Sequence, residues 1–256
     1  MEKNMNEQEN QAITQETEEV SVASPEQEEV ELTADEESTT PEERKKRNRR
    51  TITRKIAVTA VFSALAFLLY WLGQFCKLLF AFPNFLELHF SELPALIAGF
   101  CLGPQYGAIV IIVKCLLKMP LSGTVCVGEA TDILLGLAFV LPASFIYRKF
   151  KSKKGALLGV GIGTLCLVVL SLITNCVISI PFYTKLYFHG DMDLLITATG
   201  MRILFPGITV DNFYGYYLGL SVIPFNLLRG ILISSLSFVI YKRLSRLIKR
   251  WTEQYR

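Results

Sequence analysis

The first 43 residues of this chain contain no aromatic residue, and the remainder of the chain contains little acidic charge. Of the 23 Asp and Glu residues, 15 lie in residues 1–50 and only eight in residues 51–256. The second part keeps 19 of the 26 basic residues, and its apolar runs are too long for the core of a soluble domain. The composition therefore excludes an ordinary soluble domain and predicts an all-α integral membrane protein with a polar N-terminal tail.

The sequence also lacks motifs that several function classes require. No GxxxxGK[ST] phosphate-binding loop occurs, so nothing in the sequence predicts that the chain powers transport by itself. The six cysteines form no CxxC pair, and we expect neither a metal site nor a disulfide framework. An integral membrane enzyme acting on lipid or prenyl substrates would need clustered Asp, Glu and His, but only two histidines are present.

Residues 1–50 are predicted to form a disordered acidic tail that ends in a basic cluster. The Glu, Gln, Ser and Thr content of residues 1–43 offers too little apolar surface to offset the chain entropy lost on folding. Six positive charges then lie within residues 44–50. Such a cluster can bind nucleic acid, but its position before an apolar run favours the basic flank of a membrane helix. We therefore expect the lipid bilayer as a partner and no nucleic acid.

Residues 51–256 are predicted to form the membrane domain. Its long apolar runs cover residues 55–72, 93–117, 127–147, 156–180 and 218–241. Basic clusters at 44–55, 148–154 and 242–250 should all be cytoplasmic, because Lys and Arg are enriched in cytoplasmic loops. Only an even number of spans places all three clusters on one side.

Six transmembrane helices satisfy this condition if the 93–117 run contains two short spans. The Gly and Pro residues of 99–107 are natural helix breakers and divide the run at that point. Both termini are then cytoplasmic, and the second and third helices are short. The outer connections are predicted over residues 73–92, 119–126 and 182–217.

Several motifs of the membrane part resemble, in order and spacing, the substrate-binding S components of energy-coupling factor (ECF) transporters, and the riboflavin-specific branch in particular. These motifs are LHFSELPAL at 88–96, the Gly and Pro residues of 99–107, VGEATD at 127–132, AFVLPA at 138–143, Asn175 before PFY at 181–183, and IPFNLLRG at 223–230. The resemblance covers about residues 54–247 and excludes the tail.

The resemblance implies a six-helix protein of the bacterial plasma membrane whose second and third helices are short. It implies that riboflavin is captured on the outer side as a transported ligand, with no cofactor. Transport would then require docking onto a transmembrane coupling protein and two ATP-binding subunits. An S component for another vitamin, a membrane enzyme, and a scaffolding protein whose acidic tail is the working part remain as alternatives.

The candidate ligand-binding residues are polar groups near the outer ends of the spans. Asn226 and Arg229 lie three residues apart and share one face of the last helix. Asn175 lies near the outer end of the fifth helix, and polar groups in spans normally face the bundle interior. The resemblance adds Glu92, as a partner for ligand hydroxyls, and Tyr183. The alternatives are interhelical hydrogen bonds for the Asn residues and snorkelling to the interface for Arg229.

Two further patterns have structural interpretations. Glu129 and Asp132 are expected in the first turn of a helix, where carboxylates complement the helix dipole, and no His or Cys partner is expected for them. Ala60 and Ala64 form a small-xxx-small pattern that allows close helix approach, and the resemblance implies that it docks the coupling protein. A similar Gly repeat at 155–163 is expected to serve internal packing.

Overall fold

A computed structural model describes residues 40–73 and 88–254, and this part of the chain contains helices, turns and no strand. The all-α fold predicted from the sequence is confirmed for these residues. The chain divides into two units, Met1–Ile52 and Thr53–Arg256. The disorder predicted for residues 1–39, and most of the first outer connection predicted over 73–92, lie outside the described residues.

The basic end of the predicted tail is helical, so the prediction of disorder is wrong for residues 41–50. Helix α3 (Pro41–Gly73) begins with Pro at its first position and Glu42 and Glu43 in its first turn. Thr40 and Glu43 form a capping box, because the Glu43 backbone N–H donates to Thr40 Oγ1 and the Thr40 backbone N–H donates to Glu43 Oε2. The helix continues into the apolar run, so these residues extend an existing helix and need no nucleus of their own.

Among the described residues, five helical stretches are long and apolar enough to span a membrane: Pro41–Gly73, Pro104–Leu121, Val127–Lys149, Lys153–Phe188 and Phe213–Ser237. A shorter apolar helix, α4 (Glu92–Cys101), precedes α5 (Pro104–Lys118), which ends in the 3₁₀ turn η1 (Met119–Leu121). Gly103 separates α4 from α5 with φ = +118°, a conformation that favours glycine, and Pro104 starts the next helix. The predicted break and the predicted six helices are confirmed.

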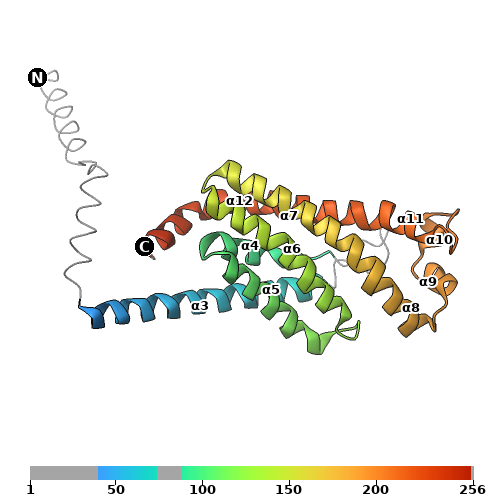
Figure 1. The fold of residues 1–256 in the computed structure, drawn as a ribbon, viewed down its shortest axis with the longest axis horizontal. Helices are drawn as coiled ribbons and strands as arrows, with labels where there is room; N and C mark the ends of the chain where they lie inside the picture. Colours follow the sequence, from blue (N-terminus) through green and yellow to red (C-terminus); the bar gives the residue numbers. More distant parts are fainter. Residues whose placement is uncertain (1–39, 74–87, 255–256) are drawn as a thin grey trace, which may run out of the picture. The chain divides into compact units, whose positions relative to one another are not determined.

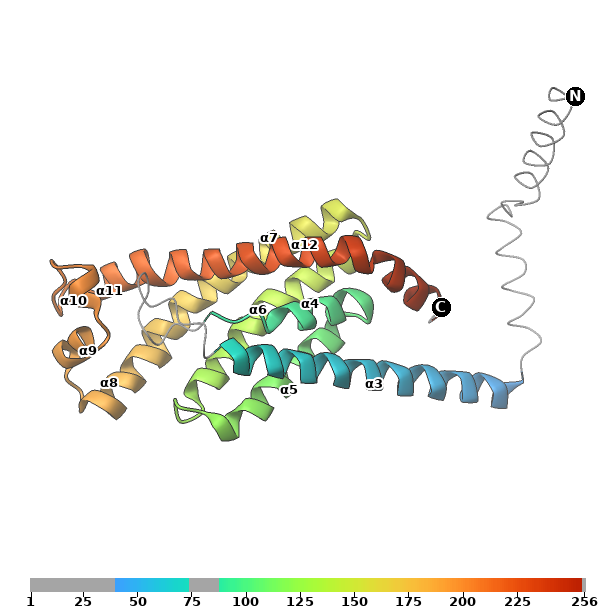
Figure 2. The same cartoon turned by 180° about the vertical axis from the view of Figure 1, so that it is seen from behind.

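Helices α6 (Val127–Lys149) and α7 (Lys153–Thr174) form the most extensive helix pair, and they run side by side in Figure 1. The Gly repeat of α7 permits this approach, since a Cβ atom on Gly159 would lie only 2.7 Å from the Ala143 carbonyl oxygen of α6. The internal-packing role predicted for these glycines is confirmed. Helix α4 contacts α5, α6 and α12 (Ile223–Gln254), and α12 runs along α7 (Figure 2).

Two long helices contain a π-helical segment just before a proline. In one, η2 (Asn175–Ser179) joins α7 to α8 (Ile180–Phe188), and in the other, η3 (Tyr217–Val222) joins α11 (Phe213–Tyr216) to α12. The wider turn leaves Pro181 and Pro224 inside continuous helices, although proline cannot donate the usual hydrogen bond. Residues 182–217 are predicted as a long outer connection. In the structure this segment contains the end of α8, the short helices α9 (Met192–Ala198) and α10 (Met201–Leu204), and α11.

The described residues contain two buried apolar clusters. The larger one joins α4, α5, α6, α7 and α12 around Leu96, Ile111 and Phe139. The second lies among α8 to α11 and η3, around Leu195, Phe213 and Tyr217. Outside these clusters many large apolar side chains are exposed, including Val61, Leu165 and Ile173, as expected of helices that face lipid. The cytoplasmic placement of both termini stays a prediction from the charge pattern.

Candidate functional site

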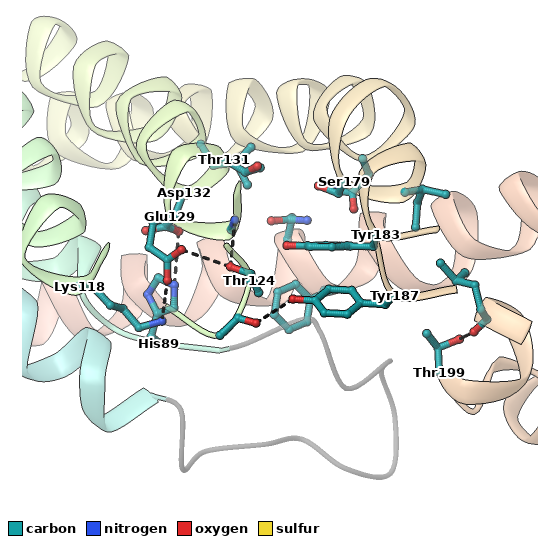
Figure 3. A pocket seen from close by; sticks show the side chains of 18 of the residues that line it. His89, Lys118, Thr124, Glu129, Thr131, Asp132, Ser179, Tyr183, Tyr187 and Thr199 are labelled. Atoms are coloured by element: carbon teal, nitrogen blue, oxygen red, sulfur yellow. Dashed lines mark hydrogen bonds and ion pairs between the residues drawn. The ribbon is translucent and has the colours of Figure 1, made fainter. Parts of the chain in front are cut away.

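A cavity of about 450 Å³ lies between the two apolar clusters, and its wall includes Leu135 of the first cluster and Ile180 and Leu195 of the second. Its other lining residues are mostly polar or aromatic: Tyr70, His89, Lys118, Gly123, Thr124, Gly128, Glu129, Thr131, Asp132, Asn175, Ser179, Tyr183, Tyr187, Phe188, Ala198, Thr199, Phe225, Asn226 and Arg229. Figure 3 shows His89, Lys118, Glu129 and Asp132 at one side of this cavity and Tyr183 and Tyr187 at the other. The volume is suited to a small organic ligand.

Arg229 of α12 is one of two cations, with Lys118, among the described residues that line the cavity. Its Nη2 atom donates to Glu92 Oε1 of α4 and, at 2.8 Å, to Asp132 Oδ1 of α6. Arg229 is 4 % exposed, so snorkelling to the interface, the alternative that the sequence left open, is wrong. The ion pairs connect α4, α6 and α12 at one point, and a buried charge needs partners of this kind.

Lys114 of α5 contacts the same two carboxylates. Its Nζ atom lies 3.1 Å from Glu92 Oε1 and 2.9 Å from Asp132 Oδ2, and it also donates to Ser91 Oγ. The Lys114 side chain is fully buried and is absent from the cavity wall. Lys114 and Arg229 therefore hold Glu92 and Asp132 between them, with two positive and two negative charges in the cluster.

His89 connects this cluster to the backbone that precedes α4. Its Nδ1 atom lies 2.8 Å from Ser91 Oγ, and its Nε2 atom lies 3.3 Å from Asp132 Oδ1. Burial lowers the pKa of the His89 imidazole, while the Asp132 carboxylate beside it acts in the opposite direction. A neutral ring that carries its proton on Nε2 accepts from Ser91 and donates to Asp132, and in that tautomer the 3.5 Å approach of Arg229 Nη2 to Nε2 is not a hydrogen bond.

A second charged group fixes the turn between α5 and α6. Glu129 accepts hydrogen bonds from Ser122 Oγ at 2.6 Å, Thr124 Oγ1 at 3.2 Å and Lys118 Nζ at 3.4 Å. From the other side of the cavity, the Tyr187 hydroxyl of α8 donates to the Gly123 carbonyl oxygen at 2.9 Å (Figure 3). The turn is thus attached to both sides of the cavity.

The structure brings four of the five predicted ligand-binding residues to the cavity wall: Asn175, Tyr183, Asn226 and Arg229. The fifth, Glu92, is buried but does not line the cavity among the described residues; it contacts Arg229 instead. Asn175 accepts from the Tyr217 hydroxyl at 2.6 Å, which is the interhelical bond that the sequence offered as an alternative. Among the described residues Asn226 makes no such interhelical bond, since its Nδ2 atom donates to Val222 of its own helix and its Oδ1 atom has no partner there.

The interpretation of the two acidic residues of α6 needs correction. Glu129 lies in the first turn as expected, but Asp132 does not. Asp132 also has the His and Cys neighbours that the sequence did not predict, because His89 and Cys115 both reach its carboxylate. His89, Glu92 and Asp132 lie close enough to hold a metal ion, yet Lys114 and Arg229 already occupy the two carboxylates.

Lys114 and Lys118 are the main residues that sequence reasoning missed. Lys114 lies in the 93–117 apolar run and Lys118 directly follows it. A lysine within a span is costly and normally marks a functional interior, so its position was the available signal. Their ammonium groups also lie over the Tyr70 ring of α3, at 4.9 Å and 4.2 Å from its centroid.

Comparison with known proteins identifies the family. The family described as "ECF transporter, substrate-specific component" matches residues 54–241. The chain belongs to this family. It is 31% identical to "Riboflavin transporter RibU" of Staphylococcus aureus over 77% of this chain and 93% of that protein. It is 29% identical to "Riboflavin transporter FmnP" of Bacillus subtilis over 79% and 96% of the two chains.

A solved structure agrees with the sequence relatives. It is described as "Structure and mechanism of the S component of a bacterial ECF transporter", shares 29% identity, and covers 77% of this chain and 98% of its own, with a TM-score of 0.56. This S component is therefore a multi-pass cell-membrane protein that acts in transport with an ECF module, and it is not an enzyme.

Proposed function

We propose that this S component binds riboflavin in the cavity and passes it inward after docking on an energy-coupling module. The names of the Staphylococcus and Bacillus relatives support riboflavin as the ligand. The cavity supports it independently, because it is lined by buried polar groups at one side and by aromatic rings at the other. A flat ring system with a polar edge and a hydroxylated chain matches both sides.

Two unpartnered polar atoms carry the proposal. Asn226 Oδ1 and Arg229 Nε are buried side-chain atoms without a hydrogen-bond partner in the described residues, and both residues line the cavity. One atom accepts and the other donates, and they come from one face of α12. The pyrimidine-like edge of the isoalloxazine ring alternates carbonyl oxygens with an N–H group. That edge would satisfy both atoms, which are costly to leave buried and unpaired.

The opposite side of the cavity suits the rest of the ligand. Tyr183 and Tyr187 of α8 lie with their ring centroids 6.0 Å apart and present aromatic surface to the cavity. Aromatic rings prefer offset or tilted contacts with other flat rings. Ser179 and Thr199 add hydroxyl groups that can bond to a ribityl chain. In this arrangement Glu92 acts by holding Arg229, and direct contact with the ligand is not required.

Replacing Asn226 with Ala tests the ligand orientation. We expect the riboflavin dissociation constant to rise about ten- to hundredfold, because a hydrogen bond made in a desolvated site is lost, at about 1–3 kcal/mol. Quenching of flavin fluorescence by the purified protein measures it. Asn48→Ala, at an exposed position of α3, is the matched control and should bind like the wild type. Unchanged affinity in a folded Asn226→Ala protein would place the ring edge elsewhere.

Docking is proposed for the exposed side of α3. Ala60 and Ala64 are exposed, whereas Thr59, Ser63 and Ala66 of the same helix are buried against the bundle. The small side chains would allow a helix of a transmembrane coupling protein to approach closely. Two ATP-binding subunits would supply the energy for which this sequence has no motif.

A further inference from the structure

We infer that Lys114 is a positioning residue for the ligand site: it balances the charge of Glu92 and Asp132 so that Arg229 can present its free Nε atom to the ligand. This inference rests on the proposed function. Lys114 does not line the cavity, and no side chain separates it from the two carboxylates. It would act through Arg229 and not by touching the ligand.

The geometry of the cluster carries the first step. Arg229 uses its Nη2 atom for both carboxylates, and Lys114, which is not part of the cavity wall, contacts the same two carboxylates. Without Lys114, two buried negative charges would share one guanidinium. The guanidinium would be drawn toward them, and its Nε atom would no longer be held at the cavity wall.

The second step concerns the groups that surround Lys114. Its ammonium donates to Ser91, and Ser91 in turn contacts His89 Nδ1, which leaves Nε2 to face Asp132. The ring of Tyr70, on α3, lies under the Lys114 ammonium, and Cys115 of α5 contacts the Asp132 carboxylate of α6. Among the described residues, the two shortest polar contacts of the His89 ring therefore lead to groups that Lys114 holds, and the ring also lies 3.5 Å from Arg229 Nη2 and against the Tyr70 ring. Removal of Lys114 would disturb His89 and Asp132, which both line the cavity.

The third step is electrostatic balance. Two cations and two carboxylates give the cluster no net charge while the His89 ring is neutral. Riboflavin is also uncharged at neutral pH, so a balanced cluster leaves no uncompensated charge beside it. If charge balance is what matters, the net charge of the cluster decides riboflavin affinity more than the lysine itself does. Neutralising one carboxylate should then restore the affinity that is lost with the lysine.

The test compares full-length purified variants: Lys114→Met, the pair Lys114→Met with Glu92→Gln, and Lys151→Met as an exposed control. We choose Glu92 for the pair because its side chain does not line the cavity. Riboflavin affinity is measured by fluorescence quenching. Thermal unfolding without ligand is measured in parallel. The visible absorption spectrum of the riboflavin that stays with the protein after gel filtration reports the hydrogen bonds to the ring, because unfolded protein retains no flavin and does not contribute to it.

We expect Lys114→Met to weaken riboflavin binding at least tenfold and to move the spectrum of bound riboflavin toward that of the free vitamin. The paired variant should recover at least half of the lost affinity, on a logarithmic scale, and the wild-type spectrum. Wild-type affinity in folded Lys114→Met would overturn the inference, as would a folded pair that binds no better than the single variant. If Lys114→Met does not fold, the paired variant alone decides. A paired variant that folds and binds riboflavin supports the charge-balancing role of Lys114, and a paired variant that fails to fold or to bind rejects it.

Failure of the proposed function would look different. If the wild type does not bind riboflavin at all, the ligand assignment is wrong whatever the variants do. If the wild type binds and all variants bind equally, the ligand assignment stands and the role of Lys114 is wrong.

Discussion

Arg229→Leu should abolish high-affinity riboflavin binding, with a dissociation constant at least about a hundredfold above the wild type. Among the described residues, Arg229 is the only cation that both lines the cavity and pairs with Glu92 and Asp132. The substitution removes this cation together with its Nε donor, which has no partner in the described residues. It also leaves two buried carboxylates with Lys114 alone. Breaking a buried ion pair from one side costs about 3–5 kcal/mol of folding stability, so thermal unfolding should shift as well.

A matched control separates this effect from the general loss of an arginine. Arg202 pairs with Asp193 at the surface, where both side chains are about half exposed, at 47% and 54%. Arg202→Leu should leave affinity and stability nearly unchanged, since exposed ion pairs contribute little. Arg229→Lys should retain part of the affinity because the charge stays, although the planar donor geometry is lost. Wild-type affinity in folded Arg229→Leu would show that this side of the cavity does not contact the ligand.

Enlarging Ala60 and Ala64 together to Leu should reduce riboflavin uptake at least tenfold while the dissociation constant of the purified protein stays within about twofold. Both positions are exposed, so the larger side chains fit the isolated S component but keep a partner helix at a distance. Ala60 lies ten residues before Tyr70 of the cavity wall, about 15 Å along the helix axis, so the binding site should not be disturbed.

Uptake of labelled riboflavin into cells that carry the coupling subunits measures the first quantity, and fluorescence titration measures the second. Ala130→Leu, at an exposed position of α6, is the matched control and should transport normally. Copurification of the coupling subunits should fall in parallel with uptake. Normal uptake with both alanines enlarged would remove α3 from the docking surface.

The sequence predicted the membrane architecture well because charge and hydropathy act locally. The break in the 93–117 run was visible in Gly103 and Pro104, and the structure has it there, with the positive φ that glycine tolerates. The π segments before Pro181 and Pro224 were not predictable in the same way. A proline in an apolar run normally indicates a helix end, and only the surrounding packing decides whether a wider turn absorbs it.

Only part of the site could be predicted residue by residue. Asn226 and Arg229 were visible because they share a face of one helix, and the structure places both at the cavity. Lys114 was overlooked because its partners, Glu92 and Asp132, lie on two other helices. Ion pairs between residues far apart in the sequence depend on helix packing, and a single sequence gives no direct signal of them.

The most direct test of the central claim is titration of the purified full-length protein with riboflavin. The account predicts quenching of flavin fluorescence to saturation at one riboflavin per chain, and a yellow protein after gel filtration. Thiamine and biotin in large excess should not displace the flavin. A folded, monodisperse protein that leaves riboflavin fluorescence unchanged, or one from which another vitamin displaces riboflavin at equal concentration, would contradict riboflavin as the substrate of this S component.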